Sequence, residues 1–208
     1  MTDADAGAAR LRSAMGALPV EGEDLEMEAS LPRDECVAVH EAGHAVAMAL
    51  SGTSIKHIIV YVDKLLSGAV VPSPQQAPVR KEFSGARLAR NMVDAYAGGA
   101  AELRFTPYWF ETAAVDLYGV RQLGRRLARS SGVAEDSYLR LAWEETCRMF
   151  LDERVWAATL QIAKDLWRQP YPNSGKRTMA GSRVQRLVHQ HLPNGWDWPA
   201  MFEIPVAG

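Results

Sequence analysis

The sequence predicts a mainly helical domain with a small two-stranded β element. Its 208 residues are 48% hydrophobic and 23% charged, which is the balance of a globular domain that can bury a sizeable core. Beyond about residue 33, apolar residues recur mostly at helical spacing and are interrupted by capping residues and glycines. Only residues 55–62 form a stretch rich in β-branched side chains, and one shorter apolar run follows it.

The acidic beginning of the chain is predicted to be a tail. Residues 1–35 carry nine acidic and three basic residues, and residues 1–30 contain no aromatic side chain. A segment of this composition has little apolar surface to bury and so tends to stay disordered. We therefore interpret residues 1–33 as a flexible or loosely docked tail, with a lid or a partner-binding arm as the alternative.

The next predicted elements are one helix and two strands. The helix begins at Asp34, a capping type of residue, and runs to about Ser51, where Gly52 suits its C-terminal end. The strands are predicted at residues 55–62 and 67–71. Three prolines between residues 72 and 78 then predict an irregular loop.

Five further helices are predicted in the rest of the chain, at about residues 84–105, 112–130, 135–151, 153–169 and 182–191. Residues 192–208 contain Trp196 and Trp198, and we expect them to form a segment packed over the body of the domain. The chain is thus divided into the tail, a domain at residues 34–191 and a C-terminal segment at residues 192–208.

Charge and cysteine content exclude several classes of protein. The net charge is −2, so no strongly basic surface indicates a nucleic-acid partner. The two cysteines, Cys36 and Cys147, cannot form a disulfide scaffold and fit a reducing compartment. No apolar stretch reaches the roughly 18–20 residues of a membrane span, and the N-terminus does not resemble a secretory signal. We expect no membrane span and a cytoplasmic location.

The strongest chemical signal is His40-Glu41-Ala42-Gly43-His44, an H-E-x-x-H sequence in the middle of the first predicted helix. Side chains at positions i and i+4 project from the same face of a helix, so the two imidazoles can hold one zinc ion. Glu41 can then serve as the general base for a zinc-bound water. The alternative is a helix that contains two hydrogen-bonded core histidines.

A catalytic zinc site needs a third protein ligand and an open position. The extended motif H-E-x-x-H-x-x-G-x-x-H is excluded, because Ala47 and Leu50 occupy its last two positions. Asp116 lies on the apolar stripe that runs from Val120 to Leu127, where a buried carboxylate needs a metal or an arginine as partner. The residues weighed for the third ligand are His57, His189, His191, Asp94, Glu102 and Asp116.

Glu102 has a different expected role. It lies at the margin of the apolar stripe of its own predicted helix, close enough to approach a histidine ligand. A zinc-bound imidazole normally donates its second ring N–H to a nearby acceptor. We therefore expect Glu102 to accept that N–H rather than bind the metal.

Several segments resemble the FtsH family of AAA-linked, ATP-dependent zinc metalloproteases. The zinc motif is followed by a strand pair at residues 58–71, and Ala97–Leu103 is similar to the G-G-x-A-A-E-E segment of that family. Thr112–Leu117 resembles its T-G-A-x-N-D segment, and Thr178–Val184 its L-x-G-x-x-V segment. The resemblance covers roughly residues 34–190, with Leu103 and Val115 replacing a glutamate and an asparagine of the family pattern.

This resemblance implies a helical zincin-type metallopeptidase domain, Zn²⁺ as cofactor, and Asp116 as the third ligand beside His40 and His44. The phosphate-binding sequence G-x-x-x-x-G-K-[ST] of an ATPase does not occur in the 208 residues. We therefore expect a zinc endopeptidase without an ATPase in the same chain, acting on unfolded or flexible polypeptides unless a separate ATPase delivers other substrates.

We expect the substrate to add as a strand along Ser67, Gly68, Ala69 and Val70, through main-chain hydrogen bonds. Two alternatives remain from the sequence. One is a non-enzymatic peptide-binding or adaptor module on the protease fold. The other is a zinc hydrolase that acts on a substrate other than peptide.

Overall fold

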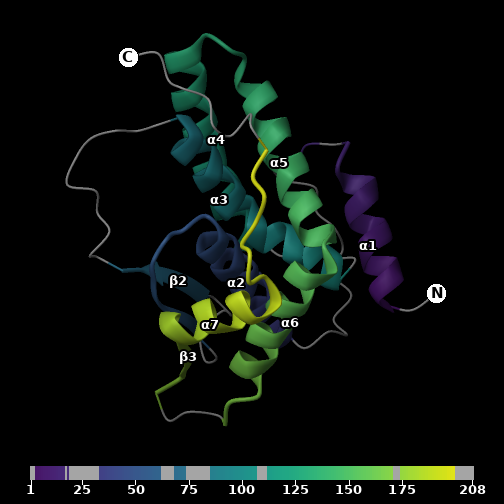
Figure 1. Ribbon diagram of the computed structural model, residues 1–208, viewed down its shortest axis with the longest axis vertical. Coiled ribbons are helices and arrows are strands. Elements are labelled where there is room, and N and C mark those ends of the chain that lie inside the picture. Colours follow the sequence, from purple (N-terminus) through teal and green to yellow (C-terminus); the bar gives the residue numbers. More distant parts are fainter. Residues whose placement is uncertain are drawn as a thin grey trace.

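The computed structural model describes residues 3–16, 18, 33–61, 68–73, 85–106, 112–170 and 174–199. These residues form seven helices and one antiparallel sheet (Figure 1). In chain order the elements are α1 (Asp3–Ala14), α2 (Arg33–Leu50), β1 (Ile55–Tyr61), β2 (Gly68–Pro72), α3 (Gly85–Phe105), α4 (Thr112–Ser131), α5 (Glu135–Leu151), α6 (Glu153–Trp167), β3 (Lys176–Ala180) and α7 (Gly181–His191).

Helix α2, which carries the H-E-x-x-H sequence, lies in the middle of the molecule and packs against both α3 and α6. Its small residues allow this close packing. A Cβ atom at Gly43 would lie 2.6 Å from the carbonyl oxygen of Ala97 in α3, a separation that real side chains do not adopt. The absence of a side chain at Gly43 therefore allows the α3 backbone to pack closely against α2. Residues of the two helices can then lie in the same site.

The core continues from α2 and α3 into α5 and α6. Its largest fully buried side chains include Met92, Trp143, Phe150, Ile162 and Leu166. The rings of Tyr96 and Trp143 meet edge to face at a centroid distance of 5.3 Å, which joins α3 to α5. Figure 1 shows α4 and α5 extending together to the top of the molecule, with the sheet and α7 at the opposite end.

The sheet has three strands in the order β2-β1-β3, with β1 antiparallel to both neighbours. The mainly helical fold is thus confirmed, but the prediction of only two strands is wrong. The missed strand, β3, has a single β-branched residue, Thr178, and so lacks the usual composition of a strand. Its side chains nevertheless alternate, with Arg177 and Met179 buried and their neighbours exposed.

Residues 3–14, which belong to the segment predicted to be a flexible or loosely docked tail, form α1 and pack against α3 and α5. Leu11 is completely buried. The Arg10 guanidinium donates hydrogen bonds of 3.1 Å to the carbonyl oxygens of Leu103 and Arg104, near the C-terminal end of α3. These bonds satisfy carbonyls that have no partner inside a helix. Of the remaining residues of the predicted tail, 1–2, 17 and 19–32 lie outside the described residues.

The described part of the C-terminal segment, residues 192–199, lies against α5 and α2. The indole N–H of Trp196 donates to Glu145 at 2.9 Å, and that of Trp198 donates to the carbonyl oxygen of Leu50 at 3.3 Å. Residues 200–208 lie outside the described residues. None of the helices in the described ranges combines the length and the apolar composition needed to cross a bilayer.

Candidate metal centre

Two helices bring three potential metal ligands together. His40 and His44 lie one turn apart on the same face of α2, and Asp116 enters from α4. The two Nε2 atoms are 2.9 Å apart, and Asp116 Oδ2 lies 3.0 Å from that of His40 and 3.1 Å from that of His44. The third member is 72 residues from His44 in the sequence, so tertiary packing assembles the group.

The donor set and its spacing suit a small divalent ion. Neutral imidazole nitrogen and carboxylate oxygen are both common zinc ligands. Bonds of about 2.0–2.1 Å in a tetrahedral arrangement separate the ligand atoms by about 3.3 Å. The three observed separations lie a few tenths of an ångström below that value, so the group needs only a small outward adjustment to hold an ion.

His44 is held in the orientation that directs Nε2 toward the centre. Its Nδ1 lies 2.7 Å from the backbone carbonyl oxygen of Asp94. A carbonyl oxygen can only accept, so Nδ1 carries the hydrogen and Nε2 of the neutral ring keeps its lone pair for a metal. Asp94 was weighed as a ligand from the sequence, but its carboxylate instead accepts from the Ser51 hydroxyl at 3.1 Å. Burial raises the pKa of the Asp94 carboxyl to about 7.

His40 contacts a carboxylate, that of Glu102, through its other ring nitrogen. Its Nδ1 makes an ion-pair contact of 3.1 Å with Oε1 of Glu102, a side chain of α3 that is completely buried. A buried carboxylate needs such a partner, and the contact leaves His40 Nε2 directed at His44 and Asp116. The structure thus places Glu102 behind a histidine, on the side away from the three convergent atoms.

The three groups form a coupled electrostatic cluster. Burial alone would lower the pKa of His40, but the Glu102 and Asp116 carboxylates raise it well above the ordinary value. Burial and His40 likewise act to lower the pKa of His44, which the Asp116 carboxylate raises. Burial acts to raise the pKa of Asp116, but its contacts with the two histidines hold it below the ordinary value. In the absence of a metal, the imidazoles and the carboxylates therefore each favour the charged form of the other.

Gly98 of α3 forms one wall of the centre. A Cβ atom there would lie 2.5 Å from Nε2 of His44 and 2.6 Å from Nε2 of His40. Any side chain at this position would occupy the space beside both potential ligand atoms. From the sequence, Gly98 was noted only as part of the segment Ala97–Leu103, and no role was assigned to it. A glycine inside a helix costs about 1 kcal/mol relative to alanine, so its position already indicated a steric requirement.

Glu41 lies beside the centre and under the start of β2. Only 5% of the residue is exposed, and burial raises the pKa of its carboxyl. A Cβ atom at Gly68 would lie 2.5 Å from Cδ and Oε1 of Glu41. Glycine at the first position of β2 therefore allows the strand to pass directly over this carboxylate.

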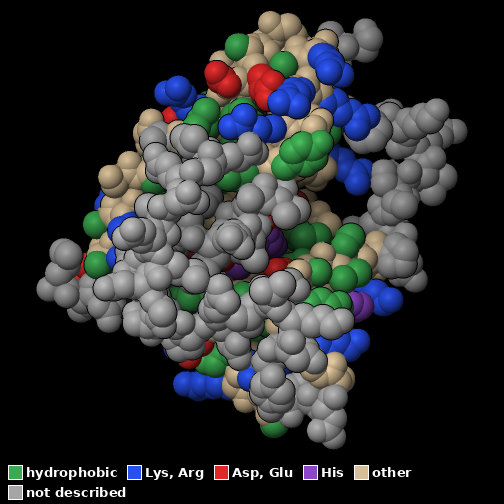
Figure 2. Space-filling model, turned by 180° about the vertical axis from the view of Figure 1, so that it is seen from behind, with side chains coloured by type: hydrophobic (Ala, Val, Ile, Leu, Met, Phe, Trp, Pro, Cys, Tyr) green, Lys and Arg blue, Asp and Glu red, His purple; other side chains and the backbone are tan. Residues whose placement is uncertain are grey.

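The centre is open to solvent on one side. The side chains of His44 and Asp116 are 14% and 27% exposed, whereas that of His40 is only 4% exposed. Histidine and acidic side chains lie beside one another near the middle of the face drawn in Figure 2. This partial exposure leaves room for a further ligand, as a catalytic metal requires.

Within the described residues, His40, His44 and Asp116 are the group of histidine, cysteine and acidic side chains that could hold a metal ion. His57 on β1 and His189 and His191 on α7, which the sequence left open as ligands, are not part of it. Of the predicted substrate-binding residues, Gly68, Ala69 and Val70 form β2, and Ser67 lies outside the described residues.

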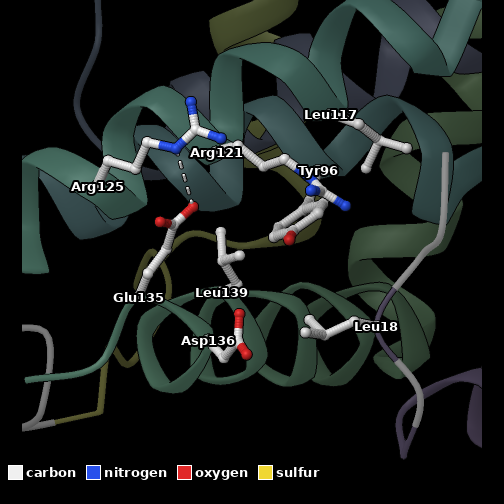
Figure 3. Close-up of a pocket in the computed structure, with 8 residues that line it drawn as sticks. All are labelled: Leu18, Tyr96, Leu117, Arg121, Arg125, Glu135, Asp136 and Leu139. Carbon is white, nitrogen blue, oxygen red and sulfur yellow. Dashed lines mark ion pairs between the residues drawn. The ribbon is translucent and has the colours of Figure 1, made fainter.

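A separate cavity of about 250 Å³ lies between α4 and α5 and does not include the three potential ligands. Figure 3 shows Tyr96, Leu117 and Leu139 around it, with Arg125 and Glu135 facing each other at 3.5 Å. Its walls carry charges of both signs and no histidine. The cavity is therefore distinct from the candidate metal centre.

Comparisons with known proteins provide no family assignment. No protein-family model matches the chain, and no curated protein has a similar sequence. The functional interpretation consequently depends on the geometry of the site and on the short segments that carry the resemblance.

Proposed function

We propose that this protein is a zinc-dependent endopeptidase, with a peptidase domain of the FtsH type and no ATPase in the described chain. The convergence of His40, His44 and Asp116 within hydrogen-bonding distance of one another carries the proposal. Two core histidines in a helix would not need a carboxylate from another helix between their Nε2 atoms. The buried Glu41 beside this group gives the same arrangement a base.

The three convergent side chains would hold the ion, and two further groups orient them. The Asp94 carbonyl fixes the ring of His44, and Glu102 fixes that of His40. A bound zinc ion would supply Lewis acidity, which would polarise the scissile carbonyl and make the attacking water more acidic. Glu41 accepts a proton from the attacking water and donates it to the leaving amine.

An extended polypeptide is the substrate that suits this site. Among the described residues β2 is an edge strand of the sheet, and a Cβ atom at Gly68, its first position, would overlap the Glu41 side chain. A chain that adds as a strand along β2 therefore passes close to the base. Such pairing requires a free main chain, so substrates are unfolded or flexible segments, and a separate ATPase would be needed for folded ones.

Two measurements on the purified protein test the proposal. We expect one zinc ion per chain by elemental analysis and cleavage of unfolded casein that a chelator abolishes and added zinc restores. A peptide-binding module would bind casein without cleaving it, and a zinc hydrolase of another specificity would bind zinc without acting on casein. Either result would contradict the proposal.

A further inference from the structure

The sheet has two edge strands. They differ in whether the central N–H and C=O groups that point away from the sheet are hydrogen-bonded to a side chain. Among the residues that the structure describes, β2 and β3 each pair with β1 on one side only. In antiparallel pairs, residues alternate between those that bond across the pair and those whose N–H and C=O point to the other side. Outward-pointing groups on an edge strand are available to any extended chain, including a second copy of the same protein.

On β3 the central outward-pointing groups are already bonded. The side-chain amide of Gln169, just beyond the end of α6, donates to the carbonyl oxygen of Thr178 at 3.0 Å. Its carbonyl oxygen accepts from the Thr178 N–H at 3.3 Å. These are the same two bonds that a residue of an added antiparallel strand would make with Thr178. The amide is itself held in place by a second donation, to the carbonyl oxygen of Asp165 at 3.2 Å.

The register of the sheet fits this pairing. Thr178 lies opposite Ile59 of β1, and Ile59 lies opposite Ala69 of β2. Because Thr178 bonds to Gln169, its groups point away from β1, so the Ile59 groups point toward β2 and pair with Ala69. The outward groups of β2 are then those of Gly68 and Val70, on the two sides of Ala69.

Both ends of the β3 edge are also poorly suited to pairing. At one end, the Lys176 carbonyl oxygen accepts from the Ser174 hydroxyl at 3.4 Å, and the charged Lys176 side chain is exposed. At the other end, the chain leaves the sheet after Ala180 to begin α7 at Gly181. At the centre of β3, an added strand would bond to the N–H and the carbonyl oxygen of Thr178. The Gln169 side chain already occupies both.

We propose that Gln169 closes the β3 edge to strand addition and thereby directs extended polypeptides to β2, beside Glu41. The closure of β3 rests on the hydrogen bonds alone, whereas its use in directing a substrate rests on the proposed peptidase function. Without the Gln169 amide, the open β3 edges of two copies would pair with each other.

The experiment uses the full chain without added zinc or substrate. Amide hydrogen exchange, measured at a protein concentration low enough to keep the chains monomeric, should show the Thr178 N–H protected in the parent, and about tenfold faster exchange after Gln169→Ala removes its partner. Sedimentation over a range of protein concentrations should show a larger, concentration-dependent species for Gln169→Ala than for the parent. Gln161→Ala, the same change at an exposed position of α6, is the matched control and should behave like the parent.

A second change identifies the edge that associates. Thr178→Pro removes the outward N–H, and proline is tolerated where a strand N–H faces away from the sheet. Added to Gln169→Ala, it should return sedimentation to that of the parent. The inference is wrong if the Thr178 amide of the parent exchanges as fast as an unstructured amide, if Gln169→Ala sediments like the parent, or if Thr178→Pro leaves the larger species unchanged. None of these readouts depends on peptidase activity, so a failed peptidase assay would leave the closure of β3 intact.

Discussion

Gly98 lies so close to His44 that a single added methyl group would reach 2.5 Å from the Nε2 atom of the imidazole. The same methyl group would lie 2.6 Å from both Cε1 and Nε2 of His40. The backbone of α3 thus forms a wall of the centre without contributing a side chain. This relationship explains why a helix that is otherwise rich in good helix formers contains a glycine at this position.

Gly98→Ala should therefore weaken metal binding, because both imidazoles must turn away from the new Cβ atom. We expect at least a tenfold loss of zinc affinity, the lower end of the range for disturbed ligand support, measured by competition with a chelator. Gly119→Ala in α4 is the matched control, since nothing lies within 4 Å of its Cβ position. Equal zinc affinity for the two variants would mean that α3 does not confine the centre.

Asp116 and Glu102 are both acidic, but they should respond differently to substitution. Asp116→Ala removes a potential ligand and should lose most of its zinc. Glu102→Ala removes the partner of His40 Nδ1 and should weaken zinc affinity only about 10–100-fold. Metal content after titration against a chelator distinguishes them, with circular dichroism to verify folding. If Asp116→Ala keeps zinc as tightly as the parent while Glu102→Ala does not, the ligand assignment is reversed.

The docking of α1 should contribute measurably to stability. Leu11→Ala removes a completely buried side chain and should reduce the free energy of unfolding by about 2–5 kcal/mol. Ser13→Ala, at an exposed position of the same helix, should change it by less than about 0.5 kcal/mol. Denaturant unfolding of the two variants measures both values. Equal stability of Leu11→Ala and the parent would show that α1 is detached in solution.

The stabilising effect of zinc should increase with pH. In the metal-free protein the pKa values of His40 and His44 are raised above 6.5. Their contribution to stability is therefore complete below about pH 6.5 and is lost as pH rises through the folded-state values. Zinc must displace these protons, so it binds weakly in acid and more tightly in base. Melting temperatures with zinc and with chelator should diverge from pH 5.5 to pH 8.5, and a constant difference would contradict this coupling.

The sequence was most informative where one local rule sufficed. The predicted limits of the long helices agree with the structure to within about two residues, because periodicity and capping are local. The pair His40 and His44 followed from helical spacing. The choice of Asp116 over Glu102 used the resemblance as well as the pattern, since both lie near apolar stripes and only the contact of Asp116 with the Nε2 atoms of His40 and His44 distinguishes them.

Other features depend on tertiary contacts that leave little trace in composition. The charged and alanine-rich α1 buries Leu11 because a neighbouring helix offers carbonyl oxygens to Arg10. The strand β3 forms because β1 offers it an edge, although four of its five residues are not β-branched. The support of His44 comes from a backbone carbonyl, which every residue carries and which therefore gives no sequence signal.

The most direct test of the account is a comparison of Glu41→Gln with the parent, both loaded with zinc. Glu41 is assigned as the base and not as a ligand, so the variant should bind zinc as tightly as the parent. Its cleavage of unfolded casein should fall by about 10²–10⁴-fold, the usual contribution of general base catalysis. Cleavage at the parent rate by a zinc-loaded Glu41→Gln variant would contradict the proposed mechanism.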